Sequence, residues 1–151
     1  MMNPYTFYHS LAELEVALGF SLPVLPNEPV ASYISIEDKI GDIRYGEKGQ
    51  ERYSFRQATL ATRAEVSNTG APGIAGIYYS TLHSTHLHQN RAISCYVYRT
   101  GLYGHQDMAF AIWEDTHYAY SLVFYCSHIK QDDEAVAILL EHVAKLIQNR
   151  S

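Results

Sequence analysis

The stretch Met108–Tyr125, which reads MAFAIWEDTHYAYSLVFY, decides the fold expected for this chain. Two apolar runs flank a short polar break at residues 114–116, and this pattern predicts a buried antiparallel hairpin. The only tryptophan of the sequence, Trp113, ends the first run beside the apolar residues Phe110 and Ile112. We therefore expect its indole to be largely buried and the hairpin to lie at the centre of a sheet.

A helix is predicted over residues 132–148, a short distance after the hairpin. Acidic residues begin it, where the helix dipole favours negative charge. Its apolar stripe consists of Val136, Leu139, Leu140, Val143 and Ile147, and the hairpin offers a matching face through Tyr118, Tyr120, Leu122 and Phe124. Because the connection is short, we expect the helix to cover that face. The opposite face, with His117, Ser121 and some of the tyrosines, is then the better place for a partner.

The rest of the chain supplies a second, short helix and further strands. Ser10 and Glu13 form a capping box for a helix over residues 10–18, and Gly19 is its expected end. Strands are expected over 31–36, 40–45, 51–58, 74–80 and 92–99, while residues 59–73 and 81–91 stay open. We therefore expect residues 1–151 to form one α+β domain. It would have a twisted antiparallel sheet of about six or seven strands, with the C-terminal helix on one face and the short N-terminal helix nearby.

Composition and charge limit the classes of function. With 47% apolar and 18% charged residues, the chain is globular rather than disordered. A net charge of -5 without a basic stripe argues against nucleic-acid binding. No apolar run is long enough to span a membrane, and no signal-peptide pattern opens the chain. We expect a cytoplasmic protein from the sequence as given, or an extracytoplasmic one if it is a fragment of an anchored protein.

The histidines His83, His86 and His88 are the first candidates for chemistry. If residues 85–89 form a strand, His86 and His88 point to one face, where His105 is a candidate to join them. Three or four imidazoles suit zinc or nickel. The spacing matches no strong metal motif, so a polar, exposed segment is the simpler interpretation and metal binding the alternative.

Two further groups favour structure over chemistry. Glu114, Asp115 and His117 offer carboxylates beside an imidazole, but Glu-Asp between two strands is typical of a turn. The glycines from Gly70 to Gly76 lack the Lys-Ser/Thr pair of a phosphate-binding loop, which predicts an ordinary flexible loop.

Serine and cysteine give no strong nucleophile motif. Ser84 and Ser127-His128 place hydroxyls near imidazoles, but neither lies on a nucleophile elbow, so an unrecognised hydrolase is a third hypothesis. Cys95 and Cys126 lie in apolar runs and are expected to be buried thiols, with their pairing left open. We assign no catalytic, cofactor-binding or metal-ligating residue, and no cofactor.

Thirteen tyrosines are the most unusual feature of the composition, and tyrosine favours half-buried sheet. Packing against the sheet is the simpler interpretation, and a groove for a peptide or amphipathic ligand is the alternative. The set considered is Tyr78, Tyr79, Tyr96, Tyr98, Tyr103, Tyr118 and Tyr120.

Several short motifs follow one another in a fixed order over roughly residues 4–148. They are Gly19-Phe20-Ser21-Leu22-Pro23, Tyr45-Gly46, Tyr53-Ser54-Phe55-Arg56, Ile74-Ala75-Gly76-Ile77-Tyr78 and A-x-W-x-D-x-x-Y-x-Y-S from Ala111 to Ser121, before a helix that starts in acids. In this order they resemble an uncharacterised bacterial domain-of-unknown-function family. Its members occur as the extracytoplasmic part of membrane-anchored, anti-sigma-factor-like proteins and as small stand-alone or lipoprotein-like proteins. The resemblance implies an antiparallel sheet packed with helices and brings no established catalytic residues. The histidine-rich segment after Tyr79 and the missing anchor depart from it.

The leading hypothesis is therefore a non-enzymatic bacterial binding or regulatory module with a protein or peptide partner. A metal-binding protein that uses His83, His86 and His88 is the alternative, and a hydrolase is the third hypothesis.

Overall fold

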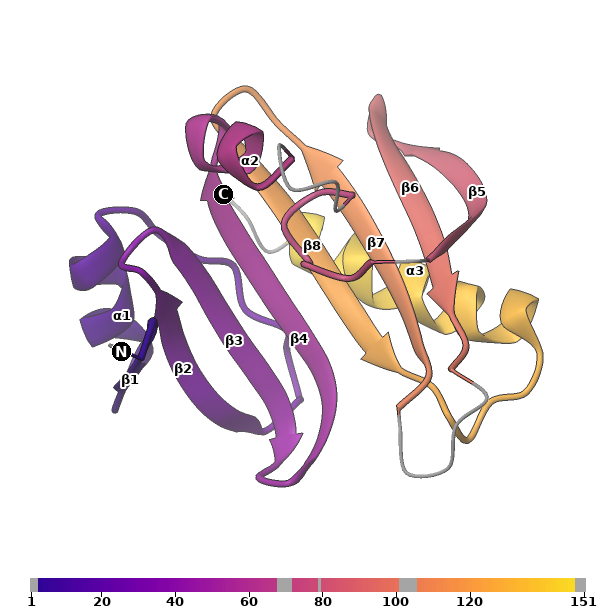
Figure 1. The fold of residues 1–151 in the computed structure, drawn as a ribbon, viewed down its shortest axis with the longest axis horizontal. Helices are drawn as coiled ribbons and strands as arrows, with labels where there is room; N and C mark the ends of the chain where they lie inside the picture. Colours follow the sequence, from indigo (N-terminus) through magenta and orange to yellow (C-terminus); the bar gives the residue numbers. More distant parts are fainter. Residues whose placement is uncertain (1–2, 68–71, 79, 101–105, 149–151) are drawn as a thin grey trace.

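The described residues form a single eight-stranded antiparallel sheet with three helices (Figure 1). The structure was obtained as a computed structural model that describes residues 3–67, 72–78, 80–100 and 106–148. The strands are β1 (Tyr5–Tyr8), β2 (Val30–Ile36), β3 (Ile40–Glu47), β4 (Gln50–Thr59), β5 (Thr81–His88), β6 (Arg91–Tyr98), β7 (Met108–Glu114) and β8 (Tyr118–Tyr125). The helices are α1 (Leu11–Leu18), α2 (Leu60–Ser67) and α3 (Asp132–Gln148). The strand order is β1-β2-β3-β4-β8-β7-β6-β5, so β1 and β5 form the two edges of the sheet.

The expected α+β class with a C-terminal helix is confirmed, but the prediction of six or seven strands is wrong. β1 and β5 were not predicted as strands, and the strand expected over residues 74–80 is irregular where the structure describes it. β5 reads TLHSTHLH and has a strand neighbour on one side only, so its sequence lacks the apolar pattern of a buried strand. The apolar residues of segment 74–78 have another role, which is to cover the sheet: Ile74 and Ala75 are buried.

Helix α3 covers the sheet face on which the main core lies, as predicted. Tyr120, Leu122 and Phe124 of β8 are buried in one cluster with Val136, Leu139, Val143 and Ile147 of α3, while Tyr118 packs at its margin. Leu140 of the expected stripe is only partly buried, and Leu146 is buried in addition. The cluster also contains Trp113, whose expected burial is confirmed. Its ring stacks on Tyr120 with ring centroids 5.5 Å apart.

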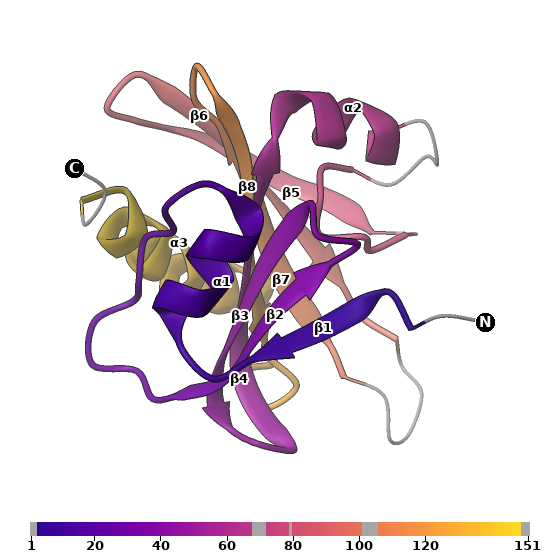
Figure 2. The ribbon, with the colours of Figure 1, turned by 90° about the vertical axis from the view of Figure 1, so that its left-hand side faces the viewer.

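Helix α1 extends the same layer over β2 and β3, on the side of the sheet that α3 occupies. Leu14 is fully buried in the main cluster. Ser10 caps the helix by accepting from the backbone N–H of Glu13, and Gly19 ends it in the left-handed region at φ 83°. Figure 2 shows α1 and α3 on one side of the sheet and α2 on the other. We call the side with α1 and α3 the helix face and the opposite side the far face.

Residues 59–67, which the sequence left open, form the end of β4 and then α2. Thr59 ends β4, and its hydroxyl oxygen accepts from the backbone N–H of Thr62 at 3.2 Å, which caps the first turn of α2. Among the helices that the structure describes, none is long and apolar enough to cross a membrane.

Two neighbouring leucines of α3 test how much of the stability comes from the helix face. Leu139 is fully buried, and Leu140 lies at the margin of the same cluster. We expect Leu139→Ala to lower the free energy of unfolding by about 2–5 kcal/mol, because it leaves a cavity in the core. The control Leu140→Ala makes the same chemical change in the same helix and should cost less than half as much. Urea melts of both variants measure this, and equal losses would contradict the packing described.

Candidate functional site

Part of the far face is covered, because a polar clamp holds segment 72–78 against it. The guanidinium Nη1 of Arg56 on β4 donates to the carbonyl oxygens of Ile74 and Ala75, both at 3.3 Å. Its Nε donates to the carboxylate of Asp42 on β3 at 3.3 Å, and Asp42 also accepts from Ser54 at 3.1 Å. Asp42 is fully buried, so this pair secures the cover of the sheet at the point where the strands β3 and β4 meet.

Gly73 lets the cover approach the sheet closely. Its φ of 58° lies in the left-handed region, and a Cβ added there would lie 2.6 Å from Cγ2 of Ile112 on β7. A side chain at this position would therefore force the cover away from β7. This is the physical role of one glycine in the stretch from Gly70 to Gly76, of which residues 70 and 71 lie outside the described part of the chain.

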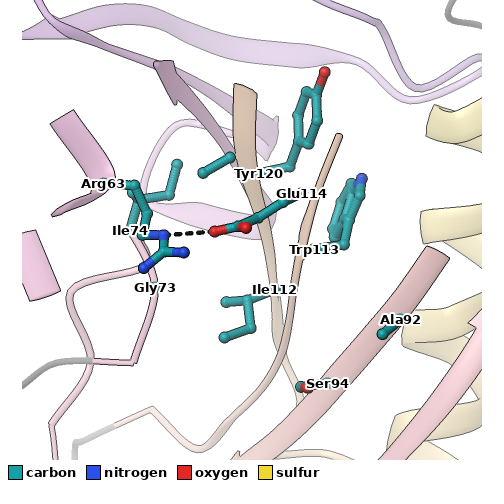
Figure 3. Close-up of a pocket in the computed structure, with 10 residues that line it drawn as sticks. Arg63, Gly73, Ile74, Ala92, Ser94, Ile112, Trp113, Glu114 and Tyr120 are labelled. Carbon is teal, nitrogen blue, oxygen red and sulfur yellow. Dashed lines mark hydrogen bonds and ion pairs between the residues drawn. The ribbon is translucent and has the colours of Figure 1, made fainter. Parts of the chain in front are cut away.

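A cavity of about 390 Å³ lies beside this cover, between α2 and the end of the sheet. Figure 3 shows Ile112 and Ile74 beside the gap, while Trp113 and Tyr120 project toward the other side of their strands. The walls come from all the elements that meet here: Arg63, Gly73, Ile74, Ala92, Ser94, Ile112, Trp113, Glu114, Ala119 and Tyr120. The volume falls in the range of small-molecule sites, which is about 300–1,000 Å³.

One ion pair crosses the mouth of the cavity. Nε of Arg63 on α2 donates to Oε2 of Glu114 at the end of β7, and the two side chains are 38% and 42% exposed (Figure 3). No described residue accepts from the two terminal nitrogens of Arg63. Because an ion pair this exposed contributes only about 0–1 kcal/mol to stability, a ligand can replace Glu114 at low cost.

The candidate acid–base residues Glu114, Asp115 and His117 at the hairpin turn do not act together, because their side chains have different partners. Glu114 faces Arg63, whereas one carboxylate oxygen of Asp115 accepts from the backbone N–H groups of His117 and Tyr118. The other oxygen of Asp115 accepts from the hydroxyl of Tyr120. Asp115 therefore stabilises the turn between β7 and β8. Of the three residues in the group, Glu114 is the one that borders the cavity.

The histidine segment forms a hydrogen-bonded chain with a serine and an acid. Ser84 Oγ lies 2.7 Å from Nδ1 of His83 and 2.8 Å from Nε2 of His86. Nε2 of His83 lies 2.7 Å from Oδ1 of Asp133 at the start of α3. The order Asp-His-Ser is that of a hydrolytic triad. The Asp133 carboxylate is 95% exposed, however, which weakens its electrostatic effect on the imidazole.

The described residues do not place enough ligand side chains together to support the metal hypothesis. His86 and His88 lie on one side of β5, as expected from a strand, but the described residues contain no group of three or more potential ligand side chains placed to share an ion. His105, the expected additional ligand, lies outside the described residues. His128 packs edge-on against Phe124, and Ser127 accepts from the backbone N–H of Asp107.

The far face, which the sequence analysis expects to be the better place for a partner, is covered in part by segment 72–78, and a partner there stays a prediction. Ser121 is fully buried there, and its hydroxyl has no hydrogen-bond partner among the described residues. His117 is exposed, but it lies in the turn. The cover was not foreseen because segment 74–80 was assigned to the sheet itself. The cavity lies on this face at the edge of the cover, and the face is also exposed farther out, at Leu82 and Leu87 of β5.

The tyrosines divide between the two faces of the sheet rather than lining one groove. Tyr118 and Tyr120 pack on the helix face, while Tyr96 stacks on Phe110 of the far face with ring centroids 5.1 Å apart. Tyr98 lies two residues further along β6, on the same side as Tyr96. Tyr78 is the last residue of the covering segment and is exposed, and Tyr79 and Tyr103 lie outside the described residues.

The two cysteines are buried, as expected, and they do not pair with each other, a point that the sequence left open. Burial raises the pKa of the Cys95 thiol to about 11 and also raises the pKa of Cys126. Both are therefore protonated at neutral pH and poor nucleophiles, because the thiolate is the reactive form.

Comparison with known proteins identifies no relative: no family model, no curated protein and no solved structure matches this chain. The resemblance to the anti-sigma-factor-like family therefore stays a prediction.

Two arginines that differ in burial test the polar clamp. Arg56→Met leaves Asp42 buried without its closest cation and releases the covering segment. We expect it to lower the free energy of unfolding by about 2–4 kcal/mol. The control Arg63→Met breaks the exposed pair with Glu114 and should cost less than about 1 kcal/mol. Urea melts measure both, and similar losses would show that the clamp does not secure the cover.

Proposed function

We propose that this protein is a non-enzymatic binding module whose cavity beside α2 takes a small amphipathic carboxylate. The observation that carries the proposal is the position of Arg63, whose terminal nitrogens have no described acceptor while its side chain borders a cavity with both polar and apolar walls. The carboxylate end of a short peptide has the same chemistry, so a peptide partner belongs to the proposal.

The cavity walls select the apolar part of the ligand. Ile74, Ile112, Ala92 and Ala119 provide hydrocarbon surface, and Ser94 adds one hydroxyl. Burying an apolar group against such walls contributes roughly 25 cal/mol for each square ångström removed from water. The small volume favours a short branched or aromatic group over a long chain.

Arg63 selects the charged part of the ligand. A guanidinium binds a carboxylate through two parallel hydrogen bonds when its planar donors are accessible. The carboxylate of its present partner Glu114 accepts from Nε of Arg63 and is 42% exposed, so it can turn into water when a ligand carboxylate binds. An amine ligand would have to leave Arg63 beside its own positive charge, which disfavours it.

Trp113 allows a direct test, because it is the only tryptophan and it borders the cavity. We expect benzoate or isovalerate to change its fluorescence in a saturable way, with a dissociation constant on the order of micromolar to millimolar. Benzylamine and isoamyl alcohol, which have comparable apolar parts, should bind at least about tenfold more weakly. Acetylated tripeptides with a free or an amidated C-terminus extend the test to peptides.

Matched variants locate the binding. Arg63→Gln should weaken carboxylate binding about tenfold or more by removing the charge. The control Arg52→Gln removes another exposed, ion-paired arginine, the partner of Glu28, and should leave binding unchanged. Equal binding of amines and acids, or equal effects of the two variants, would refute the proposed site.

A second candidate function is ester hydrolysis at Ser84, which is favoured by its hydrogen-bonded chain with His83 and Asp133. In such a reaction Ser84 Oγ attacks the ester carbonyl carbon, and its proton passes through His83 Nδ1 to the departing alcohol. Water then releases the acid by the same route in reverse.

Hydrolysis of p-nitrophenyl acetate tests this second candidate. We expect Ser84→Ala to abolish any turnover above that of free imidazole, whereas Thr85→Ala, the neighbouring hydroxyl on the opposite side of β5, should keep it. Equal rates for the two variants would exclude Ser84 as the nucleophile.

A further inference from the structure

The outer edge of β5 is an unpaired strand edge that is long and carries no Lys, Arg, Asp, Glu or Pro. β5 pairs with β6 on one side, and no described strand pairs with its other side. Natural edge strands avoid association by being short or by carrying charged side chains, proline or a bulge. β1, the other edge, has four residues, whereas β5 has eight and contains no Lys, Arg, Asp, Glu or Pro.

The bulge in β5 places its two leucines on one face instead of protecting the edge. The register with β6 shifts between Leu82 and Ser84, so that Leu82 lies opposite Tyr96, and Leu87 lies opposite Ala92. Tyr96 and Ala92 are both on the far-face side of β6. Side chains alternate between the two faces of a regular strand, so two residues five positions apart, such as Leu82 and Leu87, would point to opposite faces. Here they share one face, and they are 55% and 79% exposed.

The hairpin turn fixes which backbone groups of β5 point outward. Gln89 and Asn90 both have positive φ, 51° and 64°, which makes a two-residue turn of the primed type between His88 and Arg91. The pair that closes such a turn is hydrogen bonded, and bonded and non-bonded pairs alternate along the strands. Ser84, His86 and His88 therefore direct their backbone groups toward β6. Thr85 and Leu87 direct theirs outward.

We propose that two copies of this chain associate through antiparallel pairing of their β5 edges. A two-fold axis at His86 places Thr85 of each copy opposite Leu87 of the other, and both residues have outward N–H and C=O groups. The pairing forms two hydrogen-bonded pairs and continues the sheet across the dimer. The Leu87 side chains then become diagonal neighbours on the far-face side, where long side chains can touch.

A second copy fits this edge better than an unrelated strand because the edge is self-complementary. The same two residues supply donors and acceptors on both sides of the axis, and no Lys, Arg, Asp or Glu side chain on β5 opposes the approach. The pairing buries less surface than a standard interface of about 1,600 Å², so a dimer with a dissociation constant on the order of micromolar is expected.

Sedimentation velocity over about 5–500 µM protein at pH 8 tests the dimer. Three variants each replace an exposed apolar residue with lysine: Leu87→Lys on β5, Phe7→Lys on β1 and Val16→Lys on α1, where the wild-type residues are 79%, 63% and 84% exposed. We expect Leu87→Lys to raise the dissociation constant at least about tenfold, and the other two to change it less than about twofold. A wild-type protein that is monomeric throughout, or a dimer that Phe7→Lys or Val16→Lys dissociates as strongly, would overturn the proposal.

Amide hydrogen exchange tests the register itself. In the monomer the N–H groups of Thr85 and Leu87 face water, and we expect their exchange to slow as the protein concentration rises through the dimer transition. The N–H groups of Ser84 and His86 bond to β6 and should be protected at every concentration. Concentration-independent exchange at Thr85 and Leu87 in a protein that does dimerise would place the interface elsewhere and refute β5 pairing.

Discussion

The pairing of β4 with β8 is the interaction on which the rest of the structure depends. The chain forms two consecutive four-stranded meanders, β1–β4 and β5–β8, and this pair is the only connection between them within the sheet that the structure describes. Its register places Phe55 opposite Leu122 and Tyr53 opposite Phe124, and these aromatic and aliphatic side chains fill the centre of the helix face. Because the paired strands are far apart in sequence, their ordering requires closure of a long loop before the pair contributes stability.

The two faces of this sheet are stabilised in different ways. The helix face is covered by α1 and α3 through apolar packing, which needs no directional bonds. The far face is covered by α2 and by an irregular segment whose backbone carbonyls need hydrogen-bond donors when they are buried. Arg56 supplies them, and the buried Asp42 holds the charge of Arg56 in place. This explains why a charged pair lies between apolar strands in the middle of the sheet.

An irregular cover fits the sheet less completely than a helix would, and this is the physical origin of the cavity. Segment 72–78 follows the far face closely from Gly73, which meets Ile112, to the buried Ala75, and α2 lies at the end of the sheet. The space between them brings one arginine and one glutamate together from α2 and β7. The proposed ligand site therefore depends on three separate parts of the chain, none of which carries a recognisable motif by itself.

The sequence by itself determined the elements with strong local signals. The helix over residues 132–148, the capped helix after Ser10 and the central hairpin follow from apolar periodicity and capping chemistry, which act within a few residues. The periodicity of the hairpin and the helix also determined which face α3 covers. The roles of the remaining segments depend on residues far away in the sequence, so only the tertiary structure shows them. β5 is polar because it is an edge strand, and residues 74–78 are apolar because they cover the sheet instead of joining it. The meeting of Arg63 with Glu114 follows from the placement of α2 above the β4–β8 pair, and no local pattern encodes that contact.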